Sequence, residues 1–513
     1  MNQASRVIVN TLAQYMKIIC VIVLSLYSTR IVLRELGSDD FGLYSLVGSV
    51  LAFLSFLNTT IIRSTQRFLS YYMGRNDFEY QKKVFFNSVL LNFLISLSTF
   101  VVIILLEPLL FDGFINVSQD KLYTARILYR LIGVSVIFTI NVSPFNAVFV
   151  SHENIVFSSL MYIFIAALRL LAALVLVFIN EDKLLWYGLF MMIISALDFF
   201  IYFIVARIKY YECRKIVKKA NFDKKLMIEI LSFAWWNLYG TLCIMGRNQG
   251  YAFVINKFMA LSANAAYGVA NQISGQINNF VYSLSNAISP IITRSEGAND
   301  SQKMAFLATI SSKVSILMFA IIAFPILLEI KPILYLWLGT VPDFTVPFVV
   351  SIVIASICDS YAVGFRTAIQ AIGDIKHFSI WVYTIKVISI PSSVLLFYLN
   401  VDPKLVFIPY VVTELIGTMI TIFFYCRLTG TRVYLQFVDA IKSLLVPLSA
   451  PLVAVCVIHE MLSDSLLKIL ISIFVSSVTT AVFAYAFTLD KREKNIFKSI
   501  AVSYTHLTLP TIA

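Results

Sequence analysis

Nine charged residues interrupt long apolar stretches of the chain, where a bilayer makes an unpaired charge costly. A charge in such a place faces a protein interior or a water-filled cavity, so each is a candidate for substrate binding or ion movement. They are Arg30, Arg169, Asp198, Arg247, Lys313, Asp359, Arg366, Lys386 and Glu414.

Arg247 lies far from both ends of its apolar stretch, within the polar run Arg247-Asn248-Gln249. It is either a cation exposed to a cavity or the structural partner of a carboxylate such as Asp359. Arg30 is closer to the end of its stretch, so it either lines a cavity or extends its charged head to the membrane surface.

Two other sets of charges have competing explanations. Arg169 and Asp198 lie on neighbouring stretches and are expected to form an intramembrane ion pair. A second set lies on three successive stretches and forms either an ion-coupling site for H⁺ or Na⁺ or a group that neutralises itself. These three residues are Asp359, Lys386 and Glu414.

One apolar stretch carries a regular row of polar side chains. They recur at steps of 4, 3, 4 and 3, which places them on one face of a helix. Interhelical hydrogen bonds contribute only about 0.6 kcal/mol each on average, so five such groups favour the wall of a wet cavity over packing. The row, called the amide row below, is Gln272, Gln276, Asn279, Ser283 and Asn286.

The elements that position these groups are transmembrane helices. Of 513 residues, 59% are hydrophobic and 13% charged, well outside the range of soluble chains. Stretches of about 20 apolar residues are long enough to span a bilayer as helices. About fourteen are predicted: 12–34, 41–62, 84–106, 127–150, 155–179, 184–206, 230–256, 264–290, 310–330, 344–371, 378–399, 404–426, 441–460 and 466–489.

The distribution of basic residues predicts the orientation of the helices. With the N-terminus inside, the inner segments hold 24 Lys and Arg residues and the outer loops hold 7. This bias agrees with the positive-inside rule and predicts that both termini are cytoplasmic. The net charge of +12 therefore needs no nucleic acid to explain it.

A weak internal repeat divides the chain. A shift of 223 positions places Tyr44 on Tyr267 and the Gly74–Asp77 segment on Gly297–Asp300. Corresponding helices are six apart, which makes the repeat parallel. The predicted fold is all-α, with two six-helix bundles and two appended helices. The predicted domains are residues 1–215, 216–430 and 431–502, followed by a non-native tail at 503–513.

Known catalytic and metal-binding patterns are missing from the sequence. No GxxxxGK[ST], GxSxG or HExxH motif occurs, and the six cysteines form no CxxC pair. We therefore expect no enzyme activity, no metal and no cofactor.

The first helical hairpin resembles that of a known family. Leu36-Gly37 followed by Asp40-Phe41-Gly42-Leu43-Tyr44 is similar to the opening of bacterial Wzx-type polysaccharide flippases, which belong to the multidrug/oligosaccharidyl-lipid/polysaccharide (MOP) exporter superfamily. Ala266-Tyr267-Gly268 in the second half resembles the equivalent hairpin. The resemblance covers residues 1 to about 490 and implies a MATE-like fold.

The resemblance also implies a function. The substrate would be an undecaprenyl-diphosphate-linked oligosaccharide, flipped across the bacterial inner membrane for O-antigen, capsule or exopolysaccharide assembly, in contact with the polymerase machinery. Arg247, and also Arg30, would meet the diphosphate, and the amide row would meet the sugars. Two alternatives are a cation-coupled multidrug antiporter of the same superfamily and a membrane-embedded polymerase or acyltransferase. Short outer loops disfavour the last.

Overall fold

The structure is a computed structural model that describes residues 3–111, 119–214, 222–259, 261–338, 341–463 and 465–488. The predicted tail at 503–513, the end of the predicted segment 431–502 and the basic residues between 215 and 219 lie outside this part of the chain. Throughout the described ranges the regular elements are helices, without a strand.

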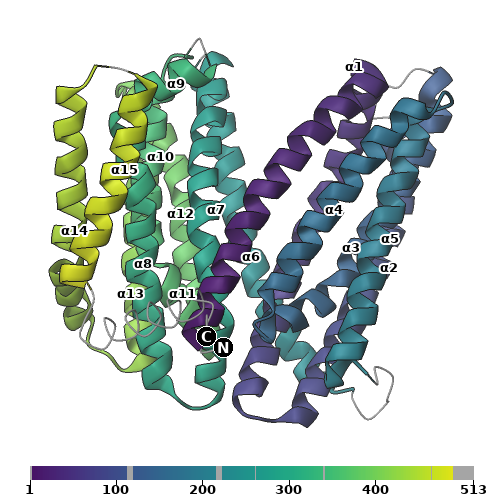
Figure 1. Ribbon diagram of the computed structural model, residues 1–513, viewed down its shortest axis with the longest axis horizontal. Coiled ribbons are helices and arrows are strands. Elements are labelled where there is room, and N and C mark those ends of the chain that lie inside the picture. Colours follow the sequence, from purple (N-terminus) through teal and green to yellow (C-terminus); the bar gives the residue numbers. More distant parts are fainter. Residues whose placement is uncertain are drawn as a thin grey trace, which may run out of the picture. The chain divides into compact units, whose positions relative to one another are not determined.

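The helices follow one another with short connections (Figure 1). In chain order they are α1 (Gln3–Gly74), α2 (Phe78–Leu109), α3 (Gln119–Ser151), α4 (Ile155–Val175), α5 (Lys183–Lys209), α6 (Lys224–Phe258), α7 (Leu261–Gly297), α8 (Ser301–Leu328), α9 (Ile330–Leu338), α10 (Thr345–Tyr361), α11 (Val363–Ile372), α12 (Lys376–Tyr398), α13 (Ile408–Thr429), α14 (Val433–Met461) and α15 (Leu466–Phe483).

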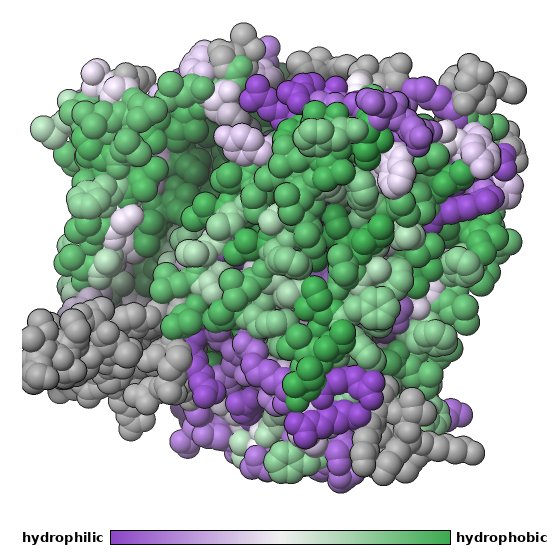
Figure 2. Space-filling view, turned by 45° about the vertical axis from the view of Figure 1, so that its right-hand side comes forward, coloured by the Kyte–Doolittle hydropathy of each residue, from purple (hydrophilic) through white to green (hydrophobic). Residues whose placement is uncertain are grey.

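The lengths and composition of these helices confirm the predicted membrane fold. Among the described residues, eleven helices are long and apolar enough to cross a bilayer, or twelve with the bent pair α10 and α11 taken as one span. The predicted spans 41–62 and 264–290 are also helical, although they are not among these twelve. On the face that Figure 2 shows, hydrophobic residues form a broad belt, and hydrophilic residues gather at its two opposite edges.

The chain separates into two compact units. The N unit comprises Val9–Leu238, and the C unit comprises residues 1–8 and the chain from Tyr239 onward, so the main division falls within α6. In the N unit α3 packs against α2 and α5, and in the C unit α7 packs against α8 and α10. The sequence-based boundary at 215 and 216 remains a prediction.

The first hairpin turns at Gly37. Its φ of 77° lies in the region that glycine adopts without steric cost, and it divides α1 into two helices. Two ion pairs hold this turn to the rest of the N unit. Lys183 of α5 lies 2.9 Å from the Glu35 carboxylate, and Lys121 of α3 pairs with Asp40. These two acidic residues of the first hairpin therefore fix its position against α3 and α5.

The repeated turns have the same local structure. Asn76 and Asn299 both have left-handed backbones, with φ of 54° and 59°. The following aspartate caps the next helix in each case: Asp77 accepts from the Tyr80 amide, and Asp300 accepts from the Lys303 amide, both at 3.0 Å. The shared sequence thus encodes one turn used twice, as a parallel repeat requires.

The appended helices α14 and α15 pack against each other and against α8 (Figure 1). Three contacts along α8 hold them. Lys313 pairs with Asp439 of α14 at 2.9 Å, and Ser476 of α15 donates to the Ile321 carbonyl. Glu329, which follows α8 at its other end, contacts His459 of α14 and Lys468 of α15. The candidate charge Lys313 therefore has a structural role.

The contact between α11 and α8 depends on a glycine. A Cβ on Gly364 would lie 2.1 Å from the Ala308 carbonyl oxygen and 2.6 Å from the Ser312 amide nitrogen. Because backbone atoms cannot rotate away, Gly364→Ala is expected to destabilise the protein by about 1–3 kcal/mol, at the upper end of that range. The measurement is the thermal unfolding midpoint in detergent. Gly268→Ala, with no atom within 4 Å of its Cβ, is the matched control and should be neutral.

Candidate functional site

A polar cavity lies inside the N unit, between α1, α3, α4 and α5. It consists of two adjoining chambers with volumes of about 210 and 390 Å³. Four polar residues line both chambers, one from each helix. They are Ser25, Thr139, Arg169 and Ser195.

Hydroxyl groups on this cavity wall are oriented by their own helices. Thr139 donates to the Ser135 carbonyl at 2.9 Å, and Ser195 donates to the Met191 carbonyl at 3.0 Å. This back-bonding uses the hydroxyl hydrogen, so toward a ligand these hydroxyl oxygens can act only as acceptors. Such a wall accepts hydrogen bonds from hydroxyl-rich molecules.

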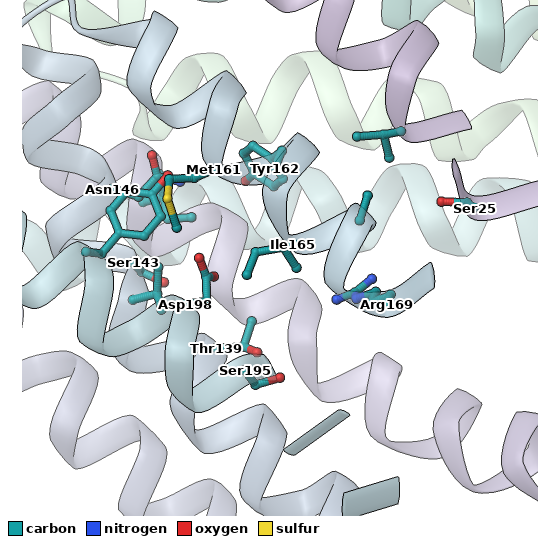
Figure 3. Close-up of a pocket in the computed structure, with 15 residues that line it drawn as sticks. Ser25, Thr139, Ser143, Asn146, Met161, Tyr162, Ile165, Arg169, Ser195 and Asp198 are labelled. Carbon is teal, nitrogen blue, oxygen red and sulfur yellow. The ribbon is translucent and has the colours of Figure 1, made fainter. Parts of the chain in front are cut away.

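Arg169 and Asp198 both face this cavity but do not form the expected ion pair. No carboxylate in the described part of the chain lies within salt-bridge distance of Arg169, whose side chain is exposed. In the view of Figure 3, Ile165 lies between the two charged groups. The expected ion pair is wrong because α4 and α5 direct the two groups to different parts of one open chamber.

The recognised hairpin contributes directly to the larger chamber. Tyr44, from the second part of α1, lines it together with Phe41 and Tyr187 of α5. The Tyr44 and Tyr187 rings meet edge to face at 4.9 Å. Phenol hydroxyls beside Arg169 add hydrogen-bonding groups to the site that the cation occupies.

A second concentration of charge lies in the C unit. Five groups form a continuous series, called the charge ladder: Arg247, Glu414, Lys386, Asp359 and Arg366. Arg247 pairs with Glu414, and Lys386 bridges the two carboxylates, at 2.7 Å from Glu414 and 2.9 Å from Asp359. Arg366 completes the ladder at 2.5 Å from Asp359.

Each end of the ladder has a different environment. At one end, Arg247 is 4% exposed, donates to the Tyr410 hydroxyl at 2.8 Å and lies over that ring. At the other end, the Asp359 and Arg366 side chains are both 15% exposed. The 45° bend between α10 and α11 falls between these last two residues, so the ladder spans a broken helix. The Arg247 end of the ladder is therefore packed among buried side chains, and the slightly more exposed Asp359–Arg366 end adjoins the bend.

The structure brings some of the predicted site residues into contact and leaves others apart. It joins Arg247, Asp359, Lys386 and Glu414 in one ladder, with the cation of Arg247 engaged by Glu414. Arg30 is exposed on α1 and lines neither chamber. Substrate contact at Arg247, Asn248, Gln249 and Arg30 therefore remains a prediction.

The amide row is a surface feature of α7. Gln272, Gln276, Asn279 and Asn286 are exposed, whereas Ser283 is buried and donates to the Asn279 carbonyl at 2.8 Å. The opposite face of the helix is polar too, where the Ser274 hydroxyl meets that of Ser356 of α10 at 2.8 Å. The exposed amides thus lie apart from the contacts that hold α7 in place.

Several cavity residues could not be selected from the sequence. Ser143 and Asn146 of α3 and Tyr162 of α4 line the smaller chamber, yet single polar residues of these types are common in membrane helices. Tyr410 and Tyr282, which contact the ladder, are hidden among the chain's 26 tyrosines. The only signal pointing to the cavity was the pair of charges, Arg169 and Asp198.

Comparisons with known proteins agree on the class of protein. A family model described as "Polysaccharide biosynthesis protein" matches residues 4–296, and one described as MatE matches residues 251–399. No curated protein matches the chain.

Solved structures share the fold. An outward-facing multidrug resistance MATE family transporter of the MOP superfamily has a TM-score of 0.69 at 11% identity, covering 84% of this chain and 96% of its own. A MOP superfamily transporter from Pyrococcus furiosus has a TM-score of 0.67 at 10% identity, with coverages of 84% and 96%. A MATE transporter from Vibrio cholerae has 0.66 at 13%, with coverages of 84% and 98%.

Proposed function

Because the chain belongs to the polysaccharide biosynthesis protein family, we propose that it flips an undecaprenyl-diphosphate-linked oligosaccharide across a bacterial inner membrane. The substrate would move from the cytoplasmic to the outer leaflet and supply O-antigen, capsule or exopolysaccharide synthesis. Alternating access around a polar cavity is the mechanism that suits a MATE-like transporter. Both termini would be cytoplasmic, as the charge bias predicts.

The observation that carries the proposal is the state of Arg169. It is an exposed cation in a hydroxyl-lined cavity, and no described carboxylate lies within ion-pair distance of it, although Asp198 lines the smaller chamber as well. The three cations of the charge ladder, in contrast, are all paired. A guanidinium in this position suits a diphosphate, which it would bind through charge-assisted hydrogen bonds.

Sugar groups need a different surface, and the exposed amides of α7 suit them. Gln272, Gln276, Asn279 and Asn286 offer both donors and acceptors along one helical face. Exposed polar groups at transmembrane depth favour a water-filled path over contact with lipid. We propose that this face forms part of the route of the oligosaccharide.

Coupling to H⁺ or Na⁺ is proposed for Asp359, Lys386 and Glu414. Neutralising Glu414 would remove the charge that holds Arg247, so proton binding and the pairing of Arg247 would be linked. The nearby bend between α10 and α11 is an element that could change angle in response.

The test compares arginine variants in two assays. Arg169→Ala is expected to lower the initial rate of flipping about 10- to 100-fold, the range for a lost hydrogen bond to a charged group. The assays are flipping of a fluorescent lipid-linked oligosaccharide in proteoliposomes and restoration of surface polysaccharide in a flippase-deficient bacterium. Arg169→Lys should retain part of the activity. Arg63→Ala is the matched control, because Arg63 of α1 is exposed but lines neither chamber.

The same proteoliposomes separate the proposal from its main alternative. If ethidium moves and the lipid-linked sugar does not, the protein is a multidrug antiporter. If the lipid-linked sugar moves at the full rate in Arg169→Ala, the cavity assignment fails.

A further inference from the structure

An unusual cluster of tyrosines and cations surrounds the turn between α1 and α2 in the N unit. Tyr72 stacks on Tyr80 with ring centroids 4.9 Å apart, and Tyr71 meets Tyr72 edge to face at 5.5 Å. Three cations lie over these rings. Arg67 and Arg75 are 5.2 and 5.3 Å from the Tyr71 ring, and Lys83 is 4.7 Å from the Tyr80 ring. We call these six residues the tyrosine–cation cluster.

The cluster carries an excess of positive charge. Neither Arg75 nor Lys83 forms an ion pair with any described carboxylate. The nearby carboxylates have partners outside the cluster: Asp77 caps α2, and Glu79 pairs with Lys82 at 2.7 Å. Glu229 of α6 is close enough to act on Tyr72 but leaves two of the three cluster cations unbalanced.

The phenol groups of the cluster are hydrogen-bond donors. Burial raises the pKa of Tyr72, and the nearby Glu229 carboxylate adds to this effect, so the phenol stays protonated. Cations and phenol donors on one surface form a site for a phosphate group.

The turn itself does not require this cluster. The matching turn of the C unit keeps the left-handed asparagine and the capping aspartate, but has Ser295 and Ala298 where the first has Tyr72 and Arg75. Because the same fold forms without these side chains, their presence in one turn alone points to a binding role.

The surroundings of the cluster indicate an amphipathic ligand. The charge bias of the sequence puts this turn on the cytoplasmic side, where the leaflet is rich in anionic lipids. Farther along α2, Phe93, Leu97 and Val101 are exposed apolar side chains. A molecule whose phosphate met the cluster could therefore extend its tails along α2, which a free phosphate or a soluble peptide could not do.

We propose that the tyrosine–cation cluster binds the phosphate of an anionic phospholipid headgroup in the cytoplasmic leaflet. Arg75 and Lys83 supply the charge, and the tyrosines hold these cations in place while donating from their hydroxyls. This site is separate from the Arg169 cavity and does not depend on the proposed function.

The experiment measures lipid binding to the full chain. The purified protein is titrated with phosphatidylglycerol and with phosphatidylcholine, and native mass spectrometry counts the lipids retained. Arg75→Gln combined with Lys83→Gln is expected to weaken phosphatidylglycerol binding about 30-fold, since each basic residue near an anionic surface contributes about a factor of five. Phosphatidylcholine binding should not change.

Matched controls decide whether the effect belongs to the cluster. Arg294→Gln combined with Lys303→Gln removes the same charge from the equivalent turn of the C unit and should leave phosphatidylglycerol binding intact. Tyr72→Phe combined with Tyr80→Phe keeps the rings and should cause a smaller loss. Equal weakening by both charge variants, or none by either, would overturn the proposal. Stronger binding of a lipid-linked oligosaccharide than of phosphatidylglycerol at the cluster would also overturn it, by making it a substrate site.

Discussion

Replacing Glu414 with glutamine is expected to lower the free energy of unfolding by about 3–5 kcal/mol. Glu414 is 5% exposed at its side chain and neutralises Arg247 while also binding Lys386. Its loss leaves the buried Arg247 guanidinium without its carboxylate in the ladder and leaves the buried Lys386 ammonium to share Asp359 with Arg366. The measurement is the thermal or denaturant unfolding midpoint of the purified protein, with unfolding of the C unit followed separately by hydrogen exchange.

Two further variants serve as controls for this stability measurement. Glu79→Gln breaks an ion pair whose carboxylate is 74% exposed, and should cost less than about 1 kcal/mol. Arg247→Met combined with Glu414→Leu removes both partners and should recover most of the stability. If the double variant is stable but does not transport, the pair has a role beyond packing. If Glu414→Gln unfolds like the unaltered protein, the ladder does not stabilise the C unit.

Glu329→Gln is expected to have a comparable effect on the appended helices, about 3–5 kcal/mol. The Glu329 side chain is fully buried, 3.0 Å from His459 of α14 and 3.3 Å from Lys468 of α15. Lys468 is only 2% exposed, so water cannot replace the lost carboxylate. Hydrogen exchange should show the largest loss of protection in α14 and α15, with the rest of the C unit less affected.

The repeat supplies an internal comparison for this prediction. Glu107 occupies the corresponding place in the N unit, where Arg130 of α3 binds it through two hydrogen bonds of 3.0 and 2.8 Å. The Arg130 side chain is 64% exposed and would be hydrated after Glu107→Gln. That variant should therefore cost only about 1 kcal/mol. If Glu329→Gln and Glu107→Gln lower the free energy of unfolding equally, the burial of the basic partner does not determine the size of the loss.

Much of the fold followed from the sequence because membrane helices are set by length and composition. Most residues of each predicted span are helical, although several spans run a few residues past a helix end, and the family resemblance drawn from the first hairpin is confirmed by the match over residues 4–296. The break in the predicted span 344–371 was missed. No proline marks it, and the charges that flank it, Asp359 and Arg366, are explained only by partners on other helices.

The candidate sites were predictable as residues but not as contacts. Both Arg247 and Arg169 could be identified as important charges because placing a charged side chain within a bilayer costs free energy. Only the packing of α6 against α12 and α13 gives Arg247 its partner, and only the spacing of α4 and α5 leaves Arg169 without a carboxylate partner among the described residues. Such differences depend on helix rotation and separation, about which a single sequence carries little information.

The charge ladder contains three cations and two carboxylates, and therefore has one excess positive charge when all five groups are ionised. That charge experiences the electric potential across the membrane. Carrying one elementary charge through the full potential changes the free energy by about 2.3 kcal/mol for each 100 mV. In an energised cell, whose interior is negative, any conformational step that displaced the ladder inward would be assisted by the voltage, and the reverse step would be opposed.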